Sequence, residues 1–283
     1  MYERHFGLRT KPFSLTPDPN FLYASTQHKT AMTMLEYGIE SQASFCLLTG
    51  EIGSGKTMLV RRLIRDLGDR VAVGLISNAH RHFKSIHPWV LSSLGIVPSD
   101  DSDIAIYEAL VDSFVRTYAA GRRTLLIIDE AQNLGAEVLE ELRLLSNVNS
   151  EGDLVLQILL VGQPELRTKL MAPELRQFAQ RVSVDFHLEP LDRKSTQAYV
   201  LHRLAVAGCE RELFSSEAIE MVHARTRGIP RLMNQLLDDA MLYAYADDRD
   251  DIDAELITQV LHDRRQGVAI ADAQGAMNAN DIR

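Results

Sequence analysis

The sequence contains very little cysteine. Its 283 residues include two cysteines, Cys46 within an apolar run and Cys209 far downstream. They form no CxxC pair and have no neighbouring histidines, which excludes a disulfide framework and argues against a cysteine metal site. We expect both thiols to be reduced and to serve packing.

Long apolar runs are also missing. No segment approaches the ~20 apolar residues that a helix needs to cross a bilayer. Residues 1–12, MYERHFGLRTKP, contain acidic, basic and proline residues where a secretory signal needs a continuous apolar stretch. We therefore expect a cytoplasmic location, with any attachment to the inner membrane made through partner proteins.

The chain lacks an excess of positive charge. It has 30 Lys and Arg against 39 Asp and Glu, a formal net charge of −9 at pH 7. Phosphate backbones and anionic lipids repel such a molecule as a whole, although one face can still be basic. With 46% hydrophobic and 24% charged residues, the chain can bury a sizeable core in one large domain or two unequal ones.

Short apolar segments predict the strands of a parallel sheet. Four are continuously apolar and rich in Val, Ile and Leu, as expected of strands covered on both faces. They lie at residues 45–50, 71–77, 124–130 and 154–162, and a fifth candidate lies at 181–191. Segments with helical spacing lie between them, at 57–67, 104–118 and 136–148. This alternation predicts a doubly wound α/β domain.

The sequence after residue 191 predicts only helices. Residues 192–207, 215–226, 230–246 and 253–263 can each form an amphipathic helix, with Asp192, Ser215 and Asp253 as caps and Pro230 in a first turn. We predict an α/β domain at residues 43–191 and a helical lid domain at 192–266. Residues 1–42, which are rich in proline, are predicted to form an ordered arm, and residues 267–283 a frayed tail.

A complete phosphate-binding motif follows the first strand. Residues 50–57, GEIGSGKT, match GxxxxGK[ST] between a strand and a helix candidate. Glycines let the backbone curl around a phosphate, and the following helix adds its positive dipole end. We expect Lys56 to contact the β and γ phosphates of ATP and Thr57 to bind Mg²⁺. A Gly-rich turn with an incidental lysine is the disfavoured alternative.

The whole loop is predicted to bind the nucleotide. Its residues are Gly50, Glu51, Ile52, Gly53, Ser54, Gly55, Lys56, Thr57 and Met58.

Two carboxylates end a second apolar strand, LLIIDE at 125–130. Ligands bind at the carboxyl edge of a parallel sheet. We expect Asp129 to support Mg²⁺ and Glu130 to polarise the attacking water. A strand ending in Asp-Glu is common by itself, but here it follows a complete phosphate-binding motif.

Other polar residues are candidates for contacts to the transferring phosphate. Gln163, at the end of a strand, could sense the γ-phosphate or make an ordinary loop hydrogen bond, and we weigh these equally. Arg176, Arg181 and Arg231 could stabilise transferring charge. An arginine from a neighbouring subunit would couple hydrolysis to assembly, whereas solvated surface arginines are the alternative.

Three further features receive structural interpretations. Residues 80–87, HRHFKSIH, predict a polar loop before a helix beginning at Pro88, in preference to a metal or nucleic-acid contact. Trp89 is expected in the core. The arginines of the helix after the phosphate loop have the spacing of a solvated face; they are Arg61, Arg62 and Arg65.

The ordered motifs GEIGSGKT, LLIIDEAQNL, LLVGQPELR, PELRQFAQR and GIPRLMNQLLDDA resemble the general secretion pathway protein A family of AAA+ ATPases. The opening, MYERHFGLRTKPFSLTPDPNFLYAS, is similar to the start of that family, so the resemblance runs from residue 1 to about residue 263. The segments VAVGLISNAH and RRTLLIIDEAQNL are most similar to the shorter branch found with exopolysaccharide and exosortase systems.

The resemblance implies an AAA+ P-loop NTPase with a five-stranded parallel core, a helical lid and Mg²⁺-dependent ATP hydrolysis. It implies Walker A roles for Lys56 and Thr57, Walker B roles for Asp129 and Glu130, and sensor 1 for Gln163. It further implies that Arg231 is the sensor 2 arginine and that either Arg176 or Arg181 is the arginine finger.

The resemblance also places the N-terminal arm near the adenine base. Phe21 or Tyr23 could line that pocket, close to His28, and packing is an equal alternative.

The resemblance implies a homo-oligomer, a ring or a filament, that drives or regulates assembly of an envelope secretion or polysaccharide export system. Secretion-branch members continue into a membrane span and a peptidoglycan-binding region, so this sequence corresponds to their cytoplasmic motor half. The alternative is a DNA-associated AAA+ regulator similar to transposition ATPases, disfavoured by the net charge and by the lack of a recognisable helix-turn-helix. A switch that binds nucleotide without hydrolysis is disfavoured by the presence of Glu130.

Overall fold

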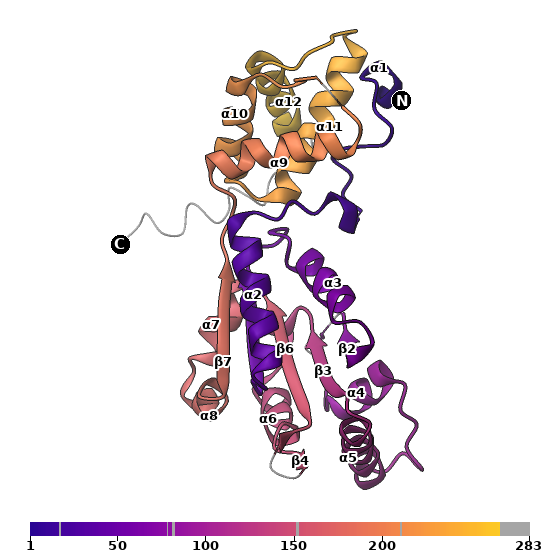
Figure 1. Cartoon of the computed structure of the whole chain (residues 1–283). Helices are drawn as coiled ribbons and strands as arrows, with labels where there is room; N and C mark the ends of the chain where they lie inside the picture. The colour runs from indigo at the N-terminus through magenta and orange to yellow at the C-terminus, as the bar shows by residue number, and fades with distance from the viewer. Residues whose placement is uncertain (17, 78, 81–82, 151–152, 210, 267–283) are drawn as a thin grey trace, which may run out of the picture. The chain divides into compact units, whose positions relative to one another are not determined.

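In the computed structural model of the chain, the apolar segments form one parallel sheet (Figure 1). Its five strands lie in the order β2-β3-β6-β1-β7. The strands are β1 Phe45–Gly50, β2 Val71–Ile76, β3 Arg123–Ile128, β6 Leu156–Gly162 and β7 Val182–Leu188. The three central strands are almost completely buried, because helices cover both faces. The predicted α/β fold class is confirmed.

The register of the central strands decides where the chain leaves the sheet. Thr49 of β1 pairs with Gly162 of β6, and Ile128 of β3 pairs with Leu160 of β6. Because all three strands are parallel, the residues that follow them emerge at one edge of the sheet.

Two layers of helices cover the sheet. On one face, α2 (Thr26–Glu40) and α3 (Lys56–Leu67) pack in a core with Leu48 and Leu159. The other face packs in a core that includes Leu47 and Ile158. Its helices are α4 His87–Leu94, α5 Asp103–Ala119, α6 Ala136–Leu145, α7 Pro164–Leu170 and α8 Arg176–Ala179. Side chains alternate along each strand, so adjacent leucines enter opposite cores.

Short elements complete this layer structure. A small antiparallel pair, β4 (Asn149–Ser150) with β5 (Asp153–Leu154), precedes β6, so the predicted strand 154–162 is interrupted near its start. Single 3₁₀ turns lie at η1 Pro19–Phe21, η2 Gly68–Arg70, η3 Ala131–Asn133 and η4 Pro173–Leu175.

The expectation that Trp89 lies in the core is wrong. Its side chain is 46% exposed, and its ring stacks on Phe83 with centroids 4.4 Å apart. The helix α4 turns Val90 and Leu91 into the core, which leaves Trp89 on the outer face. The arginines after the phosphate loop are exposed, as predicted.

The structure describes residues 1–16, 18–77, 79–80, 83–150, 153–209 and 211–266, so Pro17 and the predicted frayed tail lie outside the described residues. The chain divides into two compact units, one formed by Thr26–Glu189 and the other by Met1–Ser25 together with Pro190–Arg283. The segment 1–42, predicted as one arm, is therefore divided. Within the described ranges, no helix combines the length and apolar character needed to span a membrane.

The second unit is helical. It contains α1 Tyr2–His5, α9 Arg193–Val206, α10 Ser216–Thr226, α11 Pro230–Ala246 and α12 Ala254–Gln266. Each expected cap accepts a backbone N–H: Asp192 from Ser195 at 2.7 Å, Ser215 from Ala218 at 3.1 Å and Asp253 from Leu256 at 2.9 Å. Pro230 occupies the first turn of α11.

Residues 1–25 belong to this helical unit because their aromatic side chains complete its core. Tyr2, Phe6, Phe13 and Phe21 are buried there. The buried side chain of Arg203 on α9 holds the segment, donating from Nε to Pro12 O at 2.5 Å and from an Nη to Ser14 O at 3.2 Å. Its guanidinium also lies over the ring of Phe21, 4.6 Å from the centroid.

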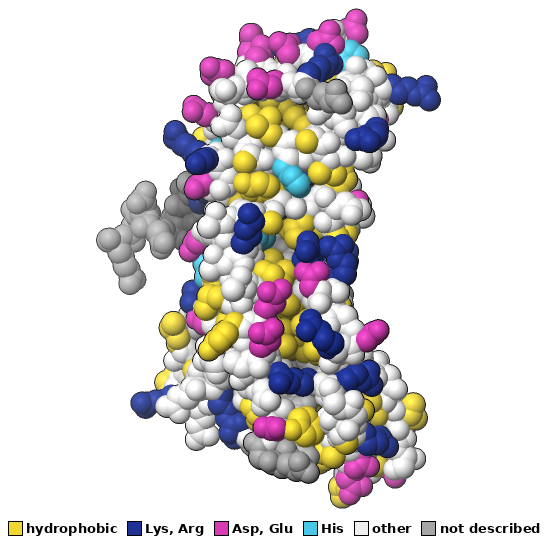
Figure 2. All heavy atoms as spheres, in the orientation of Figure 1, with side chains coloured by type: hydrophobic (Ala, Val, Ile, Leu, Met, Phe, Trp, Pro, Cys, Tyr) yellow, Lys and Arg dark blue, Asp and Glu magenta, His cyan; other side chains and the backbone are white. Residues whose placement is uncertain are grey.

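Acidic side chains gather at one end of the helical unit. The turn between α11 and α12 carries exposed carboxylates at Asp247, Asp248, Asp250 and Asp251. Figure 2 shows magenta side chains gathered at the uppermost end of this unit. Asp250 and Asp251 pair with Arg211 and Arg249, so the acidic character of this end comes mainly from the other carboxylates, and it disfavours contact with phosphate backbones.

Replacement of Arg203 tests how the N-terminal segment is held. Arg203→Ala leaves two carbonyls without their charged donor, and we expect it to lower the free energy of unfolding of the helical unit by about 2–3 kcal/mol. The measurement is urea unfolding followed by circular dichroism. Arg193→Ala, at an exposed position of the same helix, is the control. Equal midpoints for the two variants would contradict this account.

Candidate functional site

A glycine-rich loop connects β1 to α3 and closes around a lysine. Gly53 and Gly55 adopt positive φ angles of 81° and 107°, which favour glycine. Lys56 is only 7% exposed, and its Nζ donates to Gly50 O at 2.7 Å and to Glu51 O at 2.9 Å. Burial lowers the pKa of Lys56, while nearby carboxylates raise it. The loop thus holds one ammonium group among its own carbonyls.

A buried histidine lies beside the loop. A Cβ added to Gly55 would lie 2.9 Å from Nε2 of His28, which is the third residue of α2. Burial lowers the pKa of His28, and a hydrogen bond with the backbone of Ser54 opposes that shift. The Oγ of Ser54 is buried and has no hydrogen-bond partner among the described residues. Such an orphaned hydroxyl, in a loop that also holds the buried ammonium group of Lys56, fits a phosphate ligand.

Asp129 follows β3, which is separated from β1 by β6 in the sheet, and its side chain reaches Thr57 at the end of the loop. Its Oδ2 accepts a hydrogen bond from Thr57 Oγ1 at 3.2 Å, and its Oδ1 accepts from the N–H of Glu130 at 2.9 Å. Burial raises the pKa of Asp129, and these hydrogen bonds oppose the shift. Two oxygens from separate elements, placed beside a phosphate loop, fit Mg²⁺, which usually takes one or two protein oxygens together with phosphate oxygens.

Thr57 and Asp129 are not part of a larger group of metal-binding side chains among the described residues. The described part of the chain contains no cluster of three or more His, Cys, Asp or Glu side chains that could hold a metal ion.

Glu130 follows directly and adopts a left-handed backbone conformation, with φ of 57°. Its Oε2 accepts hydrogen bonds from Gln163 Nε2 at 3.2 Å and from Gln132 Nε2 at 2.5 Å. The structure therefore brings Glu130 and Gln163 into contact. Gln132 was missed in the sequence, where the only signal was an amide two residues after the carboxylate pair in DEAQN.

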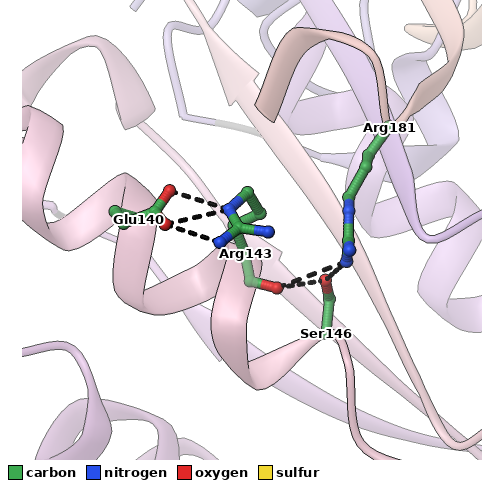
Figure 3. A network of polar contacts seen from close by, with 4 residues as sticks. All are labelled: Glu140, Arg143, Ser146 and Arg181. Carbon is green, nitrogen blue, oxygen red and sulfur yellow. Dashed lines mark hydrogen bonds and ion pairs between the residues drawn. The ribbon is translucent and has the colours of Figure 1, made fainter. Parts of the chain in front are cut away.

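Arg181 is held by hydrogen bonds within its own chain (Figure 3). It donates from an Nη to Ser146 Oγ at 3.1 Å and to Arg143 O at 3.5 Å, at the end of α6. Arg143 in turn binds Glu140, with Nη2 2.7 Å from Oε1, and this hydrogen bond lowers the pKa of the Glu140 carboxyl. The positive charge of Arg181 therefore stabilises the negative end of the α6 dipole.

The other two candidate arginines are exposed. Arg176 begins α8, and Arg231 lies in the first turn of α11 in the helical unit. No hydrogen bond described in the structure joins Arg176 or Arg181 to the loop or to the two acids.

The aromatic candidates for an adenine pocket pack inside the helical unit. Phe21 is 8% exposed beneath Arg203, and Tyr23 lies against Tyr199 and His202, with ring centroids 6.1 and 5.7 Å away. These contacts agree with the packing interpretation.

The family comparison follows the same motifs. Residues 39–170, which contain the loop, both acids and Gln163, match the family model described as an AAA domain. This chain contains an AAA domain. General secretion pathway protein A of Aeromonas hydrophila is 38% identical over 247 residues, covering 87% of this chain and 45% of that protein. The resemblance noted in the sequence is thereby confirmed, and the chain spans less than half the length of this relative.

Solved structures share the AAA-type P-loop NTPase fold. The Aeropyrum pernix ORC2 protein in ADPNP-ADP complexes matches with a TM-score of 0.65 and 18% identity, over 89% of this chain and 71% of that one. Drosophila ORC bound to DNA matches with a TM-score of 0.67 and 17% identity, over 99% of this chain and 69% of that one. At these identities the likeness establishes the fold alone.

Substitution of Gly55 tests the packing of the AAA phosphate loop. Gly55→Ala must adopt an unfavourable φ and also displace His28, whereas Gly95→Ala meets only an unfavourable φ of 67° with no neighbour within 4 Å. We expect Gly95→Ala to cost about 1 kcal/mol of stability and Gly55→Ala about 1–3 kcal/mol more. Urea unfolding measures both. Addition of His28→Ala should recover part of the extra loss, and equal losses for the two single variants would contradict the packing described here.

Proposed function

We propose that this AAA protein binds ATP with Mg²⁺ at the phosphate loop and hydrolyses it. The observation that carries the proposal is the meeting of three groups at one sheet edge: the Lys56 ammonium in its loop, the Thr57–Asp129 pair, and the Glu130–Gln163 pair. Together these groups come from the ends of the three central strands β1, β3 and β6, and the AAA domain match spans all of them.

Each part of the site has one task in this proposal. The loop N–H groups and Lys56 bind the phosphates, while Thr57 and Asp129 hold the metal. Mg²⁺, when bound, neutralises charge that develops on the phosphate oxygens. Glu130 orients the attacking water and accepts its proton, and Gln163 keeps that carboxylate and the γ-phosphate in mutual position. Arg231 keeps the sensor 2 role that the resemblance implies.

Phosphate release from Mg-ATP tests the assignment. Lys56→Ala removes the ammonium and should lower turnover by about 100-fold. Glu130→Gln should also lower turnover by about 100-fold but keep nucleotide affinity, because it leaves the loop intact. Lys84→Ala and Glu108→Gln, at exposed positions, are the matched controls. If the parent and both site variants release phosphate at the same rate, the assignment fails.

We also propose that Arg176, not Arg181, is the arginine supplied to the site of a neighbouring subunit. An arginine that acts in a second copy must be accessible on its own subunit. Arg176 is exposed, whereas Arg181 is partly buried and donates to the end of α6. The two arginines therefore have separate roles, one in trans catalysis and one in stability.

Mixing variants tests the role in trans. Arg176→Ala should abolish turnover and leave the melting temperature unchanged. Arg181→Ala should cost about 1 kcal/mol of stability, because α6 loses its C-terminal charge. Mixed with Lys56→Ala, the Arg176→Ala protein should regain activity, since a random equimolar ring or filament pairs the intact site with an intact arginine at about a quarter of its interfaces. Absence of recovery in demonstrably mixed oligomers would overturn the assignment.

The proposed setting is assembly of an envelope secretion or polysaccharide export system, from the cytoplasmic side of the inner membrane. Similarity to general secretion pathway protein A over 87% of this chain supports it. A DNA-associated role receives less support, because the net charge is −9 and one end of the helical unit is acidic.

A further inference from the structure

We propose that Gln132 is a positioning residue that fixes the Glu130 carboxylate for the attacking water. The inference rests on the proposed ATPase function and adds a residue to which no role has been assigned above. It concerns orientation, since Gln132 acts through Glu130 and Gln163.

Both ends of the Gln132 amide are used. Its Nε2 donates to Glu130 Oε2, and its Oε1 accepts the backbone N–H of Gln163 at 3.1 Å. A glutamine amide in this geometry has one assignable orientation, because both contacts require the nitrogen to face the carboxylate. The side chain therefore links the end of β3 to the end of β6 across the sheet edge.

The surrounding chain leaves space for this amide. A Cβ added to Gly162, the last residue of β6, would lie 2.8 Å from Gln132 Oε1. The φ of Gly162 is not positive, so its backbone conformation does not demand glycine. The Gln132 side chain, together with Leu166, whose Cδ2 would lie 2.9 Å from the same Cβ, provides the steric reason for a glycine at this strand end.

The backbone that carries Gln132 is also held on both sides. Ala131 is fully buried, and Asn133 Nδ2 donates to Ala79 O at 3.1 Å. On the other side, Lys169 of α7 donates to Leu134 O at 2.7 Å and to Gln132 O. With its main chain fixed, the Gln132 side chain reaches the carboxylate from a constant position.

The hydrogen bond from Gln132 restricts the conformational freedom of the Glu130 side chain. A glutamate has three side-chain torsions, and here the residue lies in a turn that follows the strand and is only partly buried. The amides of Gln132 and Gln163 both donate to one oxygen of Glu130, Oε2, and so fix the orientation of the carboxylate. Neither of these two hydrogen bonds uses the other oxygen, Oε1, which we propose faces the attacking water. Reactions that depend on a positioned base lose rate when that base samples other rotamers.

The first experiment is Gln132→Met in the full chain, which keeps the side-chain length and removes both hydrogen bonds. We expect kcat to fall on the order of 10-fold, with the affinity for a fluorescent ATP analogue and the melting temperature unchanged. Gln132→Asn, one methylene too short to span both partners, should give the same result. Gln177→Met on the exposed surface of α8 is the matched control.

The second experiment places Gln132→Met in the Glu130→Gln background and measures single-turnover phosphate release. If Gln132 acts through Glu130, the second substitution lowers the rate by less than twofold further. A full additional 10-fold loss would overturn the inference, as would a parent-like kcat for Gln132→Met or parallel losses of kcat, nucleotide affinity and melting temperature. Failure of the ATPase proposal itself is distinguishable, because then the parent and Lys56→Ala release phosphate equally.

Discussion

The parallel register of β1, β3 and β6 is the constraint on which the site depends. It ends three buried strands at one edge, so residues far apart in sequence emerge side by side. Lys56, Asp129 and Gln163 owe their proximity to the backbone pairing of these strands. The cost of placing charges at a buried edge is offset locally, since the Lys56 ammonium lies among loop carbonyls and Asp129 accepts two hydrogen bonds.

Much of this arrangement could be predicted from the sequence, because it is encoded locally. Continuous apolar runs marked the strands, and the three caps of the helical unit were recognisable from their residue type and place. The phosphate-loop motif and the Asp-Glu pair were visible because each depends on a few consecutive residues. The helices α7 and α8 were not predicted, since each is too short to show a clear period.

The parts that could not be predicted depend on contacts between distant segments. Gln132 is distinguished by reaching Gln163, and Arg181 by reaching the end of α6; neither distance can be read from spacing in the chain. The division of the segment 1–42 follows in the same way, because its aromatic side chains complete a core built almost entirely after residue 190. Trp89 was predicted wrongly for a local reason. Its residue type suggested burial, but its position around the axis of α4 leaves its side chain exposed.

The helical unit is discontinuous in sequence, and this has a mechanical consequence. The polypeptide crosses between the units twice, after Ser25 and again after Glu189, so the α/β unit is an insertion tethered at both ends. The first crossing leads directly into α2, and only two residues later His28 touches the phosphate loop at Gly55. A pull on the N-terminal connection would therefore reach the phosphate loop through a single turn of helix.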